Sequence, residues 1–186
     1  MKVFANTVTF NYSWDEVSTA NWHKYGPWNN KTEHVIAVDT LARDVDTDTG
    51  ILRTERLITC KQTAPEWLKT IMGTSMDVSY VYEASYVDPS NKTLTMVSQN
   101  LTWSNLVNVQ EEVVYKPFGD NQTKFSQSAR ITALCGGWQR IKNSIEDTLV
   151  TRFKENAAKG REGFERVLEM SRIVFAEEKA RQRQLM

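Results

Sequence analysis

The sequence predicts an α+β fold, in which a curved seven-stranded antiparallel sheet wraps around a long C-terminal helix. Seven segments have the alternating or β-branched composition of strands, and tight turns join most of them. After position 138 the hydrophobic period changes to three and four residues, which is typical of an amphipathic helix. With 186 residues, of which 40% are hydrophobic, the chain is long enough for one well-buried core.

The first strand and the first helix are predicted from the opening residues. Val3 to Tyr12 places its apolar side chains on one alternating face, which indicates a strand. Ser13 and Glu16 then have the spacing of a capping box, so a helix should begin there. That helix should end near Tyr25, because the Gly-Pro pair that follows cannot continue it.

Six further strands are predicted as three hairpins. Turn sequences rich in Gly, Pro, Asp and Asn separate the two strands of each hairpin. The predicted strands are His34 to Val45, Ile51 to Lys61, Val78 to Asp88, Lys92 to Trp103, Leu106 to Tyr115 and Lys124 to Leu134.

A long amphipathic helix should follow the sheet. Its predicted apolar stripe consists of Trp138, Ile141, Ile145, Leu149, Phe153 and Ala157, and resumes with Phe164, Val167 and Leu168. Gly160 and Gly163 weaken the helix between these two parts. We expect residues 1–170 to form the domain, and residues 171–186 to be a charged helical extension or tail.

The connection between the third and fourth predicted strands is unusually apolar. Its sequence, PEWLKTIMGTSM over residues 65–76, brings several large apolar side chains into a short segment. A sheet curved around a helix leaves an elongated space, and these side chains could close its mouth. The alternative is ordinary core packing beneath a surface loop.

Motifs of the common enzyme classes are missing from the sequence. It contains no nucleophile elbow, phosphate-binding loop or metal-binding motif, so we expect no enzyme activity, no metal and no cofactor. Glu111 and Glu112 are adjacent on a strand and should point to opposite faces, so they do not form a carboxylate pair. The formal net charge of zero gives no broad basic field for nucleic acid.

Arg56 is the most informative charged residue. Within ILRTERLITCK it shares a face with Leu52, Ile58 and Cys60. A guanidinium on such a face needs an anion, because burying an unpaired charge is costly. The more common partner is a glutamate of a neighbouring strand, and the alternative is the anionic headgroup of a ligand. Further positive charge at one end of the space could come from Lys24, Lys142, Arg152 and Lys154, each of which is individually more typical of a solvated surface.

Several segments in collinear order resemble the PRELI-domain family, also called the slowmo family. They include FNYSWDEV, HVIAVDTLARDV, LRTERLI, PEWLKTIMG, VDPSNKTL, NLTWSNLVNVQEEVVYKP and IEDTLVTRFKENAAKGREGFE, and the resemblance runs from Met1 to about Leu168. Members of this family shuttle phospholipids across the mitochondrial intermembrane space. The opening residues and TERLIT look more like the branch that moves phosphatidylserine than the branch that moves phosphatidic acid.

The resemblance implies a lipid cavity between the sheet and the long helix, closed by a lid. The lid would be Pro65 to Gly73, in which Pro65, Trp67 and Gly73 form the framework and Leu68, Ile71 and Met72 add apolar surface. The headgroup residues it implies are Lys24 and Arg56, then Lys142 and Arg152, with Lys154 and Lys61 as weaker matches. Relatives commonly have Lys-Tyr-Pro-Asn where this chain has Lys-Tyr-Gly-Pro, as if Gly26 were inserted beside Lys24.

The resemblance also implies a function and its partners. The expected function is transfer of an anionic glycerophospholipid, phosphatidylserine before phosphatidic acid, between the outer and inner mitochondrial membranes. The expected partners are anionic membrane surfaces and a small twin Cys-x9-Cys helical protein of the intermembrane space, with which the chain would form a heterodimer. Two alternatives stay open: a non-transferring assembly or regulatory factor whose cavity is structural, and a hydrolase or cyclase that uses a similar cavity.

Overall fold

The computed structural model describes residues 1–61, 78–134 and 139–185. Its sheet has the order β1-β7-β6-β5-β4-β3-β2, and all neighbouring strands are antiparallel. The strands are β1 (Lys2–Phe10), β2 (Val35–Val45), β3 (Leu52–Lys61), β4 (Val78–Asp88), β5 (Thr93–Asn100), β6 (Val107–Pro117) and β7 (Thr123–Ala133). The helices are α1 (Trp14–Ala20), the 3-10 turn η1 (Asn21–His23) and α3 (Gln139–Leu185).

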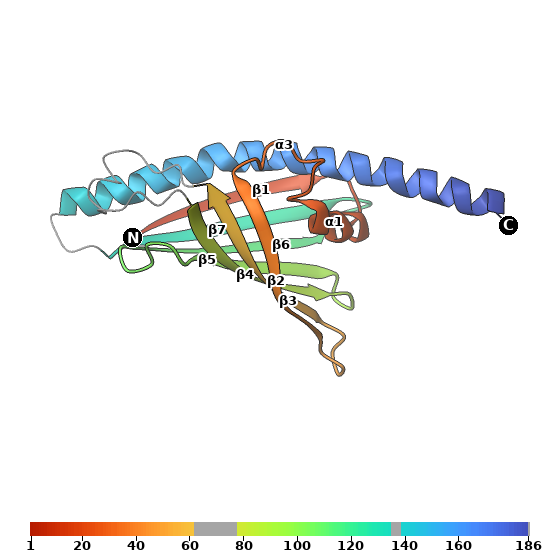
Figure 1. The fold of residues 1–186 in the computed structure, drawn as a ribbon, viewed down its shortest axis with the longest axis horizontal. Helices are drawn as coiled ribbons and strands as arrows, with labels where there is room; N and C mark the ends of the chain where they lie inside the picture. The colour runs from red at the N-terminus through yellow and green to blue at the C-terminus, as the bar shows by residue number, and fades with distance from the viewer. Residues whose placement is uncertain (62–77, 135–138, 186) are drawn as a thin grey trace.

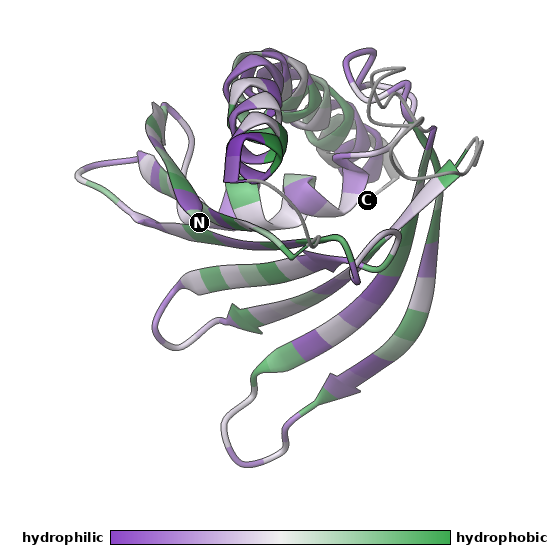
Figure 2. Cartoon of the chain, turned by 90° about the vertical axis from the view of Figure 1, so that its left-hand side faces the viewer, coloured by the Kyte–Doolittle hydropathy of each residue, from purple (hydrophilic) through white to green (hydrophobic). Residues whose placement is uncertain are grey.

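The sheet is curved, and α3 lies along its concave side. Figure 1 shows α3 running lengthwise over the strands, and Figure 2 shows the sheet curling beneath the helices when the molecule is turned by 90°. The predicted fold class, a seven-stranded antiparallel sheet around a long C-terminal helix, is confirmed. Among the described residues, no helix combines the length and the apolarity needed to cross a bilayer.

The strand predicted to reach Trp103 ends earlier, at Asn100. The Asn100 side chain turns the chain away from the sheet by donating hydrogen bonds from Nδ2 to the carbonyls of Thr102 and Val107, each over 2.9 Å. Its Oδ1 accepts a third hydrogen bond from the backbone of Val109, over 2.8 Å. Trp103 has a φ of 59°, which a strand cannot accommodate. The prediction was therefore wrong by three residues at this end.

The capping box predicted for the first helix is present. The Glu16 carboxylate accepts a hydrogen bond of 2.8 Å from the Ser13 backbone, and the Ser13 hydroxyl accepts one of 3.3 Å from the Glu16 backbone. Arg172 of α3 donates to the same carboxylate over 2.6 Å. These hydrogen bonds, above all that from Arg172, lower the pKa of Glu16 to about 2. The cap of α1 thus also attaches α1 to α3.

Two apolar cores lie between the sheet and the helices. The larger, the α1 core, contains Phe10, Trp14, Val17, Ala20, Leu94, Met96, Val113, Tyr115, Phe164, Val167 and Leu168. The smaller, the β6–β7 core, contains Val107, Ile131, Ala133 and Ile145, with Leu149, Val150 and Phe153 packed against it. The predicted helix stripe supplies residues to both cores, so α3 is held against the sheet at two places. Ile141 is an exception: it is 38% exposed, so its assignment to the stripe was wrong.

The two glycines of α3 differ in their surroundings. The helix continues through both. A Cβ on Gly160 would meet nothing within 4 Å, whereas a Cβ on Gly163 would lie 2.1 Å from Oδ1 of Asn29. Asn29 in turn donates a 2.7 Å hydrogen bond to the Lys24 carbonyl and accepts one of 3.0 Å from the Lys31 backbone. Because Gly163 has no side chain, Asn29 can pack against α3 at this point and make the hydrogen bonds that hold the segment around Lys24 in place.

The last residues of α3 extend beyond the sheet. The helix is described through Leu185, and Figure 1 shows its C-terminal end projecting past the strands. In the last third of α3, Ile173, Val174 and Phe175 are 46%, 38% and 52% exposed.

Candidate functional site

A cavity of about 270 Å³ lies between the concave face of the sheet and α3. Its volume is close to the lower end of the range of ligand pockets, ~300–1,000 Å³. Its described apolar lining comes mainly from inward-facing strand residues: Val35, Ile58, Cys60, Val81, Met96 and Val113. Its described polar lining is Lys24, Tyr25, His34, Glu83, Ser98, Glu111 and Asn156.

A row of polar side chains crosses the concave face of the sheet at this cavity. We call it the polar belt; it consists of Arg56, Glu83, Ser98, Glu111 and Gln127. In the strand register, Arg56 lies opposite Glu83, Glu83 opposite Ser98, and Ser98 opposite Glu111. Gln127 of β7 extends the row by donating a hydrogen bond to Glu111. On the concave face, apolar side chains lie on either side of the polar belt.

Arg56 and Glu83 form a buried ion pair within this belt. Each residue is only 4% exposed. Nε of Arg56 donates to Oε1 of Glu83 over 3.0 Å, and Nη2 donates to the same oxygen. The rings of Trp22 and Tyr25 lie 5.7 and 5.8 Å from the guanidinium carbon. Of the two partners considered for Arg56, the structure contains the glutamate of a neighbouring strand, while a headgroup role for Arg56 stays a prediction.

Lys24 lines the cavity from the segment that follows η1. Burial by itself lowers the pKa of its ammonium group, but the opposite effect of neighbouring acidic groups is larger, so the pKa lies above its ordinary value. These neighbours are Tyr25, Tyr115, Glu83 and Glu111. Lys24 is therefore a charged ammonium at neutral pH, and within the described part of the chain no carboxylate forms an ion pair with it.

The remaining titratable lining groups add no charge at neutral pH. Burial, helped by the charge of Lys159, lowers the pKa of His34 below its ordinary value, so its imidazole is neutral. Burial also raises the pKa of Tyr25. The charge of the cavity is thus set by Lys24, by Glu111 and by the neutralised pair of Arg56 and Glu83.

The other predicted headgroup cations do not belong to the described lining of the cavity. Lys142 and Arg152 are half-buried on α3, whereas Lys154 on α3 and Lys61 at the end of β3 are exposed. The predicted lid residues, Pro65, Trp67, Leu68, Ile71, Met72 and Gly73, lie outside the described residues.

The sequence analysis missed the acidic members of the site. Glu111 lines the cavity whereas Glu112 is exposed, as expected for adjacent residues on a strand. From their opposite orientations the sequence analysis concluded only that they do not form a carboxylate pair, and it did not assign Glu111 to the site. Glu83 was not singled out. The signal was available, because Glu83 is the charged residue on the alternating face that holds Val81, Ser85 and Val87.

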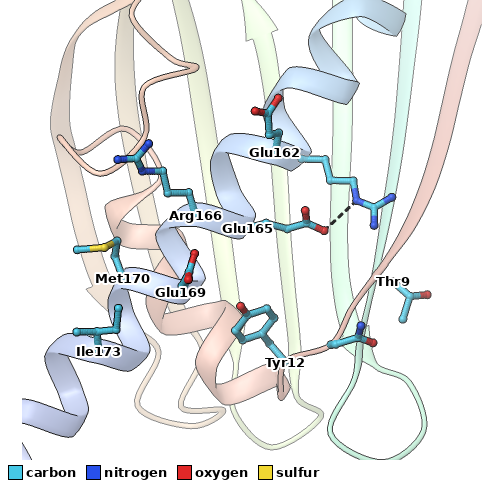
Figure 3. Close-up of a pocket in the computed structure, with 10 residues that line it drawn as sticks. Thr9, Tyr12, Glu162, Glu165, Arg166, Glu169, Met170 and Ile173 are labelled. Atoms are coloured by element: carbon cyan, nitrogen blue, oxygen red, sulfur yellow. Dashed lines mark hydrogen bonds and ion pairs between the residues drawn. The ribbon is translucent and has the colours of Figure 1, made fainter.

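A second hollow lies outside the sheet, between α3 and the end of β1 (Figure 3). It has a volume of about 600 Å³ and is lined by Thr9, Asn11, Tyr12, Arg161, Glu162, Glu165, Arg166, Glu169, Met170 and Ile173. Arg161 and Glu165 pair across 3.0 Å, and Glu162 pairs with Lys31 across 2.9 Å. The acids and bases of this surface groove largely neutralise each other. Across the described residues, no group of three or more His, Cys, Asp or Glu side chains is arranged to hold a metal ion.

Comparisons with known proteins agree with this architecture. In sequence, the chain is 47% identical over 173 residues to "Protein UPS2, mitochondrial" of Saccharomyces cerevisiae, covering 91% of this chain and 74% of that protein. It is 45% identical over 170 residues to "UPS-like protein C36.10" of Schizosaccharomyces pombe, covering 91% and 90%.

In structure, the chain resembles the Zhui aromatase/cyclase of Streptomyces sp. R1128, with a TM-score of 0.59 over 92% of this chain and 93% of that one. At 12% identity this likeness concerns the fold alone. The sequence pattern of the PRELI-like family matches residues 15–173, which is most of the chain. The protein therefore belongs to the PRELI-like family.

Proposed function

We propose that the protein carries single phospholipid molecules between mitochondrial membranes, and that anionic glycerophospholipids, phosphatidylserine first and phosphatidic acid next, are its cargo. The observation that carries this proposal is the interior cavity, which combines apolar walls with the charged Lys24. Membership of the PRELI-like family and the mitochondrial relative in yeast support it.

The energetics explain why such a carrier is needed. A diacyl phospholipid has about thirty methylene groups, and exposing each to water costs ~0.8 kcal/mol, so unaided crossing costs on the order of 20 kcal/mol. A carrier that surrounds the acyl chains with apolar side chains in place of the bilayer removes most of this cost. The affinity must stay moderate, because cargo that is held too tightly would not be released.

In this proposal Lys24 binds the phosphate. It is a charged group in the cavity without an ion-pair partner among the described carboxylates, so a phosphate would complement it. Residues 65–73 act as the lid: their apolar side chains cover the acyl chains in water and insert into the bilayer at a membrane. A small twin Cys-x9-Cys helical protein would be the partner in the intermembrane space.

Replacing Lys24 with glutamine should reduce the transfer of phosphatidylserine and phosphatidic acid between liposomes by about tenfold or more, because a charged hydrogen bond to the phosphate is lost. Transfer is measured with fluorescent lipid in donor vesicles. Lys124→Gln, an exposed lysine on β7, is the matched control and should transfer normally. Undiminished transfer by Lys24→Gln would remove Lys24 from the site.

Replacing both Trp67 and Leu68 with serine should slow transfer and leave the thermal unfolding midpoint near that of the unsubstituted protein. The reason is that a lid contributes to cargo exchange rather than to the core. Leu41→Ser, at a position of β2 that is 56% exposed, is the control for lost apolar surface. A collapse of thermal stability in the double variant would identify the segment as core packing.

The unsubstituted protein also separates the alternatives. Native mass spectrometry of the purified protein should detect one bound phospholipid. A protein that neither binds nor transfers phospholipid would fit a non-transferring assembly factor with a structural cavity, and conversion of the lipid into a product would indicate an enzyme.

A further inference from the structure

We propose that Glu111 binds the ammonium group of the cargo headgroup, so that the cavity selects phospholipids that carry an amine over those that carry negative charge alone. This inference rests on the proposed function, and it adds a residue that determines specificity within the same cavity.

The first argument is the balance of charge in the cavity. Arg56 and Glu83 neutralise each other as a buried pair. In the described structure, Lys24 and Glu111 both line the cavity and attract each other electrostatically, but they do not form an ion pair. A headgroup that presents its phosphate to Lys24 and its ammonium to Glu111 would therefore complement both charges, and phosphatidylserine has both groups in addition to its carboxylate.

The second argument is the set of hydrogen bonds around Glu111. Its Oε2 accepts from the Ser98 hydroxyl over 3.1 Å, and its Oε1 accepts from Nε2 of Gln127. Both donors are neutral, so they orient the carboxylate without cancelling its charge. An ammonium group of the ligand would give this carboxylate a directly hydrogen-bonded counter-charge, which Lys24, without an ion pair to Glu111, does not provide.

The third argument is an unused acceptor beside this carboxylate. Oε1 of Gln127 is buried and, within the described structure, has no hydrogen-bond partner. An ammonium group has three N–H donors. Gln127 is not itself part of the described cavity lining, but its amide is hydrogen-bonded to Glu111, so an ammonium group that displaces or turns this amide could donate to both acceptors.

Discrimination against a purely anionic headgroup follows from the same charges. Such a headgroup gains from Lys24 but is repelled by Glu111, and the low dielectric of the cavity strengthens that repulsion. Ser98 on β5 and Gln127 on β7 hold Glu111 from both sides, so its position is fixed before the ligand arrives.

The experiment compares cargo preference in Glu111→Gln with that in Glu112→Gln. Glu112 is the next residue on β6 and is exposed on the opposite face, so it is a matched control. Donor liposomes contain equal amounts of phosphatidylserine and phosphatidic acid, and the transferred lipids are quantified by mass spectrometry. In Glu111→Gln the ratio of phosphatidylserine to phosphatidic acid should fall about tenfold or more, and phosphatidic acid transfer should rise because its repulsion by Glu111 is lost. Glu112→Gln should keep the original ratio.

A second measurement leaves the protein unchanged and alters the cargo. Acetylating the amine of phosphatidylserine removes its positive charge, so its transfer by the unsubstituted protein should fall as far as that of phosphatidylserine by Glu111→Gln. The variant should make no further distinction between the two lipids. If the unsubstituted protein moves both lipids equally, Glu111 does not read the amine. If it moves no phospholipid at all, the proposed function itself fails.

Discussion

Replacing Arg56 with alanine should lower the free energy of unfolding by about 3–5 kcal/mol, because it leaves Glu83 buried without its counter-charge. Arg53→Ala on the same strand is the control: Arg53 is exposed and pairs with Glu55 at the surface, so its loss should change the free energy of unfolding by no more than about 0.5 kcal/mol. Urea unfolding followed by circular dichroism measures both. An Arg56→Ala protein as stable as the unsubstituted one would contradict the buried pair.

A double variant, Arg56→Met with Glu83→Leu, separates the scaffold from the site. Replacing a buried ion pair by apolar residues of similar volume is often neutral, so most of the lost stability should return. If this variant also transfers phospholipid normally, Arg56 supports the cavity and does not contact the headgroup. Arg56→Glu is less informative, because it would place two glutamates directly opposite each other in the sheet.

Replacing Phe164 with alanine should cost about 3–5 kcal/mol of unfolding free energy. Its side chain is 2% exposed in the α1 core, and its ring lies 5.5 Å from that of Phe10 and 6.1 Å from that of Tyr115. The truncation leaves a void at the place where α3 is anchored to the sheet.

Phe175→Ala is the matched control, since the same residue type on the same helix is 52% exposed there. Its effect should stay within about 0.5 kcal/mol. Both variants are compared by urea unfolding. Equal losses in the two would mean that the α1 core does not fasten α3 to the sheet.

Local patterns in the sequence were sufficient for most of the fold. The strand predicted to end at Asp88 ends there in the structure, because the turn that follows marks this end. The early end of β5 was not predictable from composition. It depends on the Asn100 side chain, whose hydrogen bonds reach Val107 and Val109 across the loop.

The site was harder to predict than the fold. Alternation showed that Arg56 faces inward, but only the register of β3 against β4 shows that Glu83 lies opposite. A family resemblance suggested Lys24, and it lines the cavity. The environment of Glu111 needed the structure, because only the pairing of β5 and β7 with β6 shows that Ser98 and Gln127 donate hydrogen bonds to it.

The strand order has a consequence for how the chain folds. β1 pairs with β7, so Lys2 lies opposite Ile131, and the first strand to be synthesised waits for the last one to complete its ladder. Contacts between such remote segments slow folding, because a long loop must close before they form. A nascent chain that ends before residue 123 lacks β7, so β1 has no strand to pair with. The sheet can therefore be completed only after all seven strands have left the ribosome.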